Sequence, residues 1–183
     1  MSKVAVFFAT GFEEIEALTV VDLLRRAGID CFMVSVTGDR QVTSSHKVQV
    51  TCDQLLEQVN FDELDMIVLP GGMPGTTNLE ACVSLMNQVD KFNREKRYIS
   101  AICAAPGILG HRGMLKGRNA CSFPEHEAAL EGAIVSKNEV EVSDHIITAR
   151  GMGCTIPFGL AIVERFKGKE AAEILKNKVI YLH

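Results

Sequence analysis

The sequence predicts an α/β fold, in which a mostly parallel sheet carries helices on both faces. Short apolar runs such as Val4–Ala9 and Met66–Leu69 have the length and unbroken hydrophobicity of strands that are buried on both faces. Segments with helical spacing of apolar residues, such as 84–96, lie between these runs. Strands that alternate with helices form parallel sheets, because each crossover helix packs back onto the sheet.

The elements can be assigned in chain order from these patterns and from turn residues. We expect strands at 4–9, 30–36, 66–69, 98–102, 119–122, 139–142 and 146–149, and a small hairpin over 37–51 with its turn signal at Gly38-Asp39. We expect helices over 13–27, 53–59 with Asp53 as its N-cap, 84–96, the stretch after Cys103 as far as 110–113, 124–130, 156–167 and 170–181.

Composition narrows the class of protein. The chain has 183 residues, of which 47% are hydrophobic and 23% charged, and we interpret 1–183 as one domain. The net charge of −4 comes without a basic block, so we expect no specific nucleic-acid binding. No apolar run approaches the ~20 residues of a membrane span, and MSKVAVFFA is interpreted as a first strand rather than a signal peptide.

The chain is organised around Arg97–Gly110, RYISAICAAPGILG, where a strand turns sharply into a helix at Cys103. A nucleophile elbow needs small residues two positions before and after the nucleophile, and Ala101 and Ala105 meet that need. The helix dipole is expected to lower the pKa of the thiol, and free N–H groups at the helix start can bind an oxyanion. The competing interpretation is a buried cysteine that acts as a small hydrophobe.

Glu16 is the candidate proton-transfer group. It stands in line with Val20, Leu23 and Ala27 along a mainly apolar stripe of the first helix. Desolvation there raises a carboxyl pKa, which suits a group that exchanges a proton near neutral pH. The alternative is an exposed carboxylate at the edge of the core.

The loop Pro70–Gly75 contains adjacent glycines at the end of a strand. It lacks the Lys-Ser or Lys-Thr of a phosphate-binding loop. Gly71 and Gly72 permit close backbone approach and can direct N–H groups at a reacting carbonyl oxygen. A simple tight turn is the alternative.

Six cysteines are scattered through the chain with no C-x-x-C pair, so we expect no metal site and no disulfide scaffold. Their distribution favours reduced thiols in a cytoplasmic protein. For Cys52, Cys121 and Cys154 we expect packing in or near the core.

Four motifs together resemble the ThiJ/PfpI superfamily, most closely the branch that holds the Parkinson disease protein deglycase and bacterial YajL. They are GFEEIEA (11–17), VLPGG (68–72), AICAAP (101–106) and ARGMG (149–153), in the same order as in the family. The resemblance implies a flavodoxin-like three-layer sandwich and a homodimer. It also implies Cys103 as nucleophile, Glu16 as its partner, oxyanion groups at Gly72 and Ala104, and no cofactor.

The same resemblance implies three possible activities. The first is a cofactor-independent glyoxalase or deglycase that acts on methylglyoxal, glyoxal or glycated protein and nucleotide groups. The second is a redox-sensing stress protein or chaperone whose Cys103 oxidises to sulfinate. The third is a cysteine peptidase or amidase.

Two positions depart from the pattern of many family members. Phe123 stands where they carry a histidine, and Met152 stands where they carry a proline. His126 lies nearby but at a different register, and His111 lies at the end of the helix after Cys103. Neither occupies the usual histidine position, which weakens the peptidase hypothesis, because a peptidase needs a base to activate the thiol.

Dimerisation is a separate hypothesis. Asp22, Arg25 and Arg26 on the first helix, with His46 in the hairpin, can supply polar contacts across a two-fold interface. The alternative is a solvated helix face.

Overall fold

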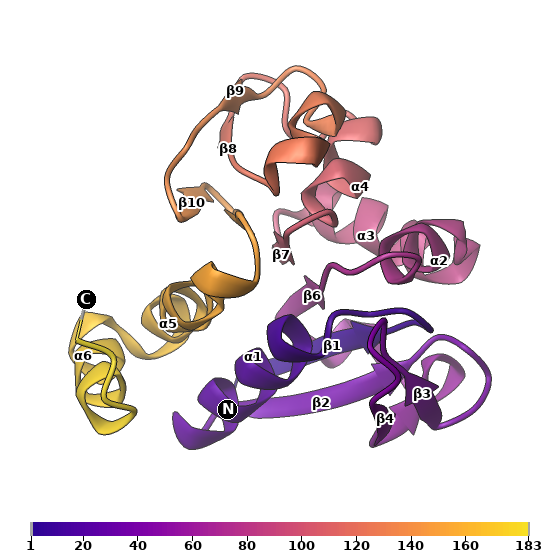
Figure 1. Cartoon of the computed structure of the whole chain (residues 1–183), viewed down its shortest axis with the longest axis horizontal. Coiled ribbons are helices and arrows are strands. Elements are labelled where there is room, and N and C mark those ends of the chain that lie inside the picture. Colours follow the sequence, from indigo (N-terminus) through magenta and orange to yellow (C-terminus); the bar gives the residue numbers. More distant parts are fainter. Residues whose placement is uncertain (1, 183) are drawn as a thin grey trace.

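A computed structural model describes residues 2–182 and contains a central seven-stranded sheet (Figure 1). The strand order is β10-β11-β7-β6-β1-β2-β5, with β10 antiparallel to β11 and every other neighbouring pair parallel. The fold is therefore the expected mostly parallel α/β sandwich. The strands are β1 Lys3–Phe8, β2 Asp30–Ser35, β5 Gln54–Leu55, β6 Met66–Leu69, β7 Tyr98–Ile102, β10 Val140–Ser143 and β11 Ile146–Ala149.

Alternate residues of each strand point to opposite faces, which divides the core in two. Val4, Val6 and Phe8 of β1 pack with α1, α5 and α6, whereas Ala5 and Phe7 pack with α2, α3 and α4. Helices cover both faces, as the unbroken apolar runs predicted. The helices are α1 Glu14–Arg26, α2 Gly75–Ala81, α3 Val83–Glu95, α4 Pro106–His111, α5 Thr155–Lys167 and α6 Lys169–Lys178. Within 2–182, none of the helices is long and apolar enough to cross a membrane.

The strand order reverses beside β1. After β1 the chain adds β2 and β5 on one side, and then β6, β7 and β11 on the other. In open α/β sheets ligands bind at such a switch point, outside the carboxyl ends of the strands. The loops after β1, β6 and β7 therefore meet at one edge of the sheet.

The hairpin forms, but its turn is not where the sequence indicated. Strands β3 Gln41–Thr43 and β4 Gln49–Thr51 pair antiparallel, and the turn between them runs from Ser44 to Val48. Gly38-Asp39 precedes the hairpin. The hairpin is tied to the loop before α1, because Gly11 N–H donates to the Thr43 carbonyl over 2.8 Å.

The predicted helix over 53–59 is wrong. That segment forms β5 and then a single 3₁₀ turn, η1 Leu56–Gln58. Asp53 does not cap a helix, because its carboxylate accepts from the Met33 N–H and pairs with Arg25. Sequence analysis also missed α2. This helix begins directly at the end of a loop rich in glycine and proline, residues that are typical of turns rather than of helices.

The segment between α4 and β10 forms a small subdomain beside the sheet. Strands β8 Asn119–Ala120 and β9 Ile134–Val135 pair in parallel and enclose η3, a 3₁₀ helix over Pro124–Ala129. Short 3₁₀ turns at η2 Phe61–Glu63 and η4 Met152–Cys154 precede β6 and α5.

Candidate functional site

The predicted site residues lie just after three neighbouring strands of the sheet. Glu16 lies in the first turn of α1, which follows β1; Gly71 follows β6; and Cys103 follows β7. Since β1, β6 and β7 are adjacent in the sheet, these residues meet although up to 87 positions separate them in sequence.

Cys103 has an unusual backbone conformation. Its φ is +66°, in the left-handed region that non-glycine residues rarely adopt, at a cost of about 1–2 kcal/mol. Two hydrogen bonds of 2.9 Å hold it there: its N–H donates to the Ala149 carbonyl, and its carbonyl accepts from the Phe123 N–H. Strain that the surroundings hold in this way is typical of functional residues.

Gly71 allows the cysteine and the carboxylate to approach each other. A Cβ at position 71 would lie 2.6 Å from the Cβ of Cys103 and 2.6 Å from Oε2 of Glu16. No side chain fits there. The sequence suggested a close backbone approach at this glycine, but not that Glu16 and Cys103 would be the groups approached.

Glu16 is only 1% exposed. Its Oε2 accepts from the Gly71 N–H at 2.9 Å, so that N–H is already engaged and positions the carboxylate. Its Oε1 is buried and makes no regular hydrogen bond to residues 2–182. Burial raises the pKa of Glu16 to about 7, helped by the negative charge of Glu13 and opposed by the Cys103 thiol and the Gly71 N–H.

Burial also raises the pKa of the Cys103 thiol to about 12, with further contributions from the charge of Glu16 and the contact with it. Backbone hydrogen bonds from Ala104 and Gly72 act in the opposite direction. The expected lowering of this pKa by a helix dipole is therefore wrong. Helix α4 is short and begins at Pro106, and desolvation and the carboxylate outweigh its effect.

Together the two groups behave as a pair that shares protons. Above pH 7 the first proton has left, and the second stays on the pair until very alkaline pH. A thiolate then forms when the proton of Cys103 moves to Glu16, because ionisation to water beside a charged carboxylate is unfavourable.

No histidine completes this site among the described residues. His111 pairs with Glu80 at 2.7 Å, and the ring of His126 lies 6.4 Å from that of Phe123. Neither makes a hydrogen bond to Cys103 within residues 2–182. Phe123 and Met152 are exposed, and the Phe123 ring lies against Gly151.

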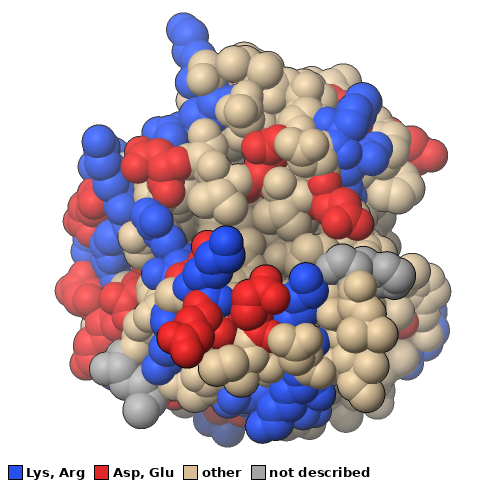
Figure 2. All heavy atoms as spheres, turned by 90° about the vertical axis from the view of Figure 1, so that its left-hand side faces the viewer, with Lys and Arg blue, Asp and Glu red and all other residues tan. Residues whose placement is uncertain are grey.

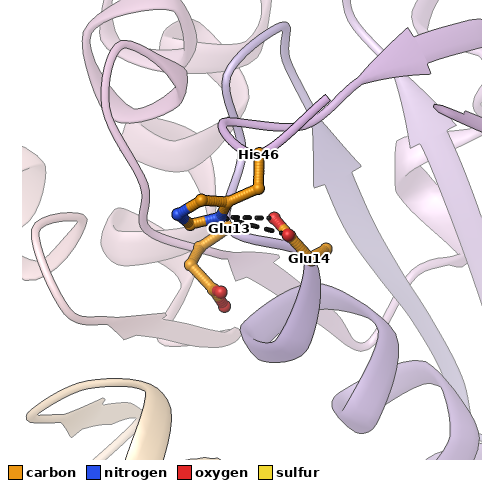
Figure 3. A group of neighbouring side chains, drawn as sticks. All are labelled: Glu13, Glu14 and His46. Carbon is orange, nitrogen blue, oxygen red and sulfur yellow. Dashed lines mark hydrogen bonds and ion pairs between the residues drawn. The ribbon is translucent and has the colours of Figure 1, made fainter. Parts of the chain in front are cut away.

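One group of side chains has the composition of a metal site. Ligand atoms of Glu13, Glu14 and His46 lie within 4.8 Å of one another. Figure 3 shows the Glu14 carboxylate facing the His46 ring, 3.1 Å away, while the Glu13 carboxylate points away from it. Glu13 accepts from the Glu16 N–H at 2.7 Å and so caps α1. An ion pair and a helix cap account for the three residues.

That cap is a site residue which sequence analysis did not identify. The sequence did not single out Glu13, yet its side chain fixes the first turn that carries Glu16. An acidic side chain at the position before the first helical residue was the available signal.

The other cysteines are packed as expected or nearly so. All six are free thiols; Cys52 and Cys121 are buried, and Cys154 is half-buried. Burial raises the pKa of all three thiols, to about 12 for Cys52 and about 11 for Cys121.

Comparisons with known proteins agree on one family. The model of the DJ-1/PfpI family matches residues 2–165. Protein DJ-1 homolog A of Arabidopsis thaliana is 37% identical over 168 residues, which are 90% of this chain but only 43% of that protein. A Caenorhabditis elegans protein named glutathione-independent glyoxalase DJR-1.2 is 29% identical over 89% of this chain and 87% of its own length. The structure of oxidized Toxoplasma gondii DJ-1 superposes with a TM-score of 0.95 at 32% identity, covering all of both chains.

Proposed function

This chain belongs to the DJ-1/PfpI family, and we propose that it is a cofactor-independent cysteine enzyme that converts 2-oxoaldehydes to 2-hydroxy acids. The observation that carries the proposal is the buried Glu16 carboxylate beside Cys103, with a pKa raised to about 7. Early glycation adducts of the same aldehydes are the related substrates. The glyoxalase name of the nematode relative supports this choice of reaction.

The reaction begins with proton transfer from Cys103 to Glu16. The thiolate attacks the aldehyde carbon, a C–S bond forms, and the aldehyde oxygen takes up the proton to give a hemithioacetal. The N–H groups of Gly72 and Ala104, which hydrogen-bond the sulfur, lie beside the developing oxyanion.

Glu16 then moves a proton within the adduct. It removes the hydrogen from the former aldehyde carbon, and the resulting enediol takes a proton at the neighbouring carbon, which leaves a thioester of a 2-hydroxy acid. Water hydrolyses the thioester and restores the thiol. Methylglyoxal and water thus give lactate, and no external oxidant or reductant is needed.

The test is methylglyoxal consumption with lactate detection in wild type, Cys103→Ala and Glu16→Gln. We expect loss of nearly all turnover in Cys103→Ala, and a decrease of about 10²–10⁴-fold in Glu16→Gln, the range for a general acid–base group. Equal, slow consumption by wild type and Cys103→Ala contradicts the proposal.

Redox sensing is the second candidate. A half-buried cysteine that transfers its proton to a neighbouring carboxylate is also a target for oxidation to sulfinate. One similar solved structure is described as oxidized DJ-1. If wild type shows no turnover but Cys103 oxidises before the other five cysteines, this second function replaces the first. Peptidase activity has less support, because neither His111 nor His126 hydrogen-bonds Cys103.

We also infer that the protein is a cytoplasmic homodimer that uses α1 and the hairpin. The charged residues expected there pair within the chain: Arg26 with Asp22, Arg25 with Asp53, and His46 with Glu14. On another face, which carries α5 and α6, Figure 2 shows acidic and basic side chains interleaved. A monomer mass by light scattering at micromolar concentration would rule out the dimer.

A further inference from the structure

A small pocket shares a wall with the candidate site. It has a volume of about 140 Å³ and lies between α2, α4 and η3. Ala104 and Met73 line it. These residues directly follow Cys103 and Gly72, and the Ala104 N–H approaches the sulfur. A molecule bound to Cys103 therefore has its neighbouring atoms at the pocket.

The lining is a mixture of hydrogen-bond donors and acceptors. Thr76, Thr77, Glu80, His111 and His126 all contribute to it. Glu80 and His111 form an ion pair at 2.7 Å. The hydroxyl of Thr76, a residue only 7% exposed, has no hydrogen-bond partner among the described residues. A buried hydroxyl without a partner is unfavourable, and a ligand that hydrogen-bonds it removes that penalty.

These groups select the chemistry of a ligand. An alkyl chain would leave the Thr76 hydroxyl without water or a hydrogen-bond partner. A carboxylate would face Glu80. Hydroxyl groups both donate and accept, and so match the mixed lining. The volume of about 140 Å³ is several times what one bound water molecule needs. That space suits a chain of three or four hydroxylated carbons.

We propose that this pocket binds the hydroxylated chain of sugar-derived 2-oxoaldehydes while their aldehyde group reacts with Cys103. The inference rests on the proposed function and gives it a substrate class. Methylglyoxal, which ends in a methyl group, would leave the pocket empty.

The experiment compares kcat/KM for methylglyoxal with that for 3-deoxyglucosone, a six-carbon 2-oxoaldehyde with hydroxyls on its distal carbons. His111→Ala and Glu80→Gln alter the pocket at partly exposed positions, so the fold should tolerate them. We expect the ratio of 3-deoxyglucosone to methylglyoxal kcat/KM to fall about ten-fold in each, as for loss of one charge-assisted hydrogen bond. Arg112→Ala, which removes a neighbouring ion pair with Asp90 outside the pocket, is the matched control and should keep the wild-type ratio. An unchanged ratio in both pocket variants overturns the proposal.

A non-reacting probe separates failure of the pocket from failure of the proposed function. Threitol, a four-carbon polyol, is titrated into wild-type protein while amide resonances are followed by NMR. We expect shifts at Gly107 and His111 that Glu80→Gln weakens. If neither aldehyde is turned over but these shifts appear, the pocket stands and the proposed function fails. If methylglyoxal is turned over and no shifts appear, the pocket proposal fails alone.

Discussion

Cys103 and Cys121 both hydrogen-bond the end of β11, but their surroundings differ. Cys103 N–H donates to Ala149 at the end of β11, and Cys121 N–H donates to the Thr148 hydroxyl one residue earlier. Burial raises the pKa of both thiols, to about 12 and about 11. Cys121 is 0% exposed, and its sulfur lies 3.4 Å from the Thr148 carbonyl. Cys103 is half-buried, on a strained backbone, beside a carboxylate.

The comparison shows that a raised pKa does not by itself distinguish a reactive cysteine from a structural one. What differs is the neighbour. The hydrogen-bond partners of the Cys121 sulfur are the Thr148 hydroxyl and the carbonyls of Thr148 and Glu139, which do not take a proton at neutral pH. Beside Cys103 lies Glu16, whose pKa near 7 lets it hold the proton that the thiol gives up.

The largest expected effect concerns the stability cost of that carboxylate. The pKa of Glu16 is raised from 4.5 to about 7, so the native state binds more protons than the unfolded state between these pH values. Wild-type stability is therefore full below about pH 4.5 and falls as pH rises through 7. Glu16→Gln should be more stable than wild type by about 3 kcal/mol at pH 8, and equal to it near pH 4. Urea unfolding at both pH values measures this difference. Glu57→Gln, at an exposed position, is the control, and a stability difference for Glu16→Gln that does not depend on pH would contradict the account.

The next prediction concerns the space between the two groups. In Gly71→Ala the new methyl group displaces either the cysteine or the carboxylate, and methylglyoxal turnover should fall by about 100-fold or more. Gly153→Ala is the matched control, since a Cβ there has nothing within 4 Å. Wild-type turnover in Gly71→Ala would show that the close approach does not matter.

A smaller effect is expected for oxidation. After mild peroxide treatment, mass spectrometry should find sulfinate at Cys103 at about ten times or more the level at Cys121, because the thiolate forms only where a proton acceptor and solvent access coincide. Comparable oxidation of both cysteines would remove the distinction between them.

Local patterns predicted most of the fold and the members of the site. The apolar runs at Val4 and Met66 indicated buried strands, and small residues around Cys103 indicated the elbow. The segment 53–59 was wrongly assigned as a helix because Asp53 is a good helix-capping residue. In the structure its carboxylate instead accepts hydrogen bonds from the Met33 N–H and the Arg25 guanidinium, which are distant in sequence. The direction of the Cys103 pKa was misjudged for a related reason: a helix start is visible in sequence, whereas the desolvation and the charge 87 positions away depend on the folded structure.

The most direct test of the shared proton is the pH dependence of Cys103 alkylation by iodoacetamide in wild type and Glu16→Gln. If Glu16 accepts the thiol proton, the wild-type rate rises with an apparent pKa near 7 and then levels off. The Glu16→Gln rate should match the wild-type rate near pH 7 and then keep rising, by about ten-fold per pH unit up to pH 9, because its thiol ionises to water with no carboxylate charge to oppose it. If the wild-type rate also keeps rising through pH 9 without levelling off, Glu16 does not hold the shared proton, and the account is contradicted.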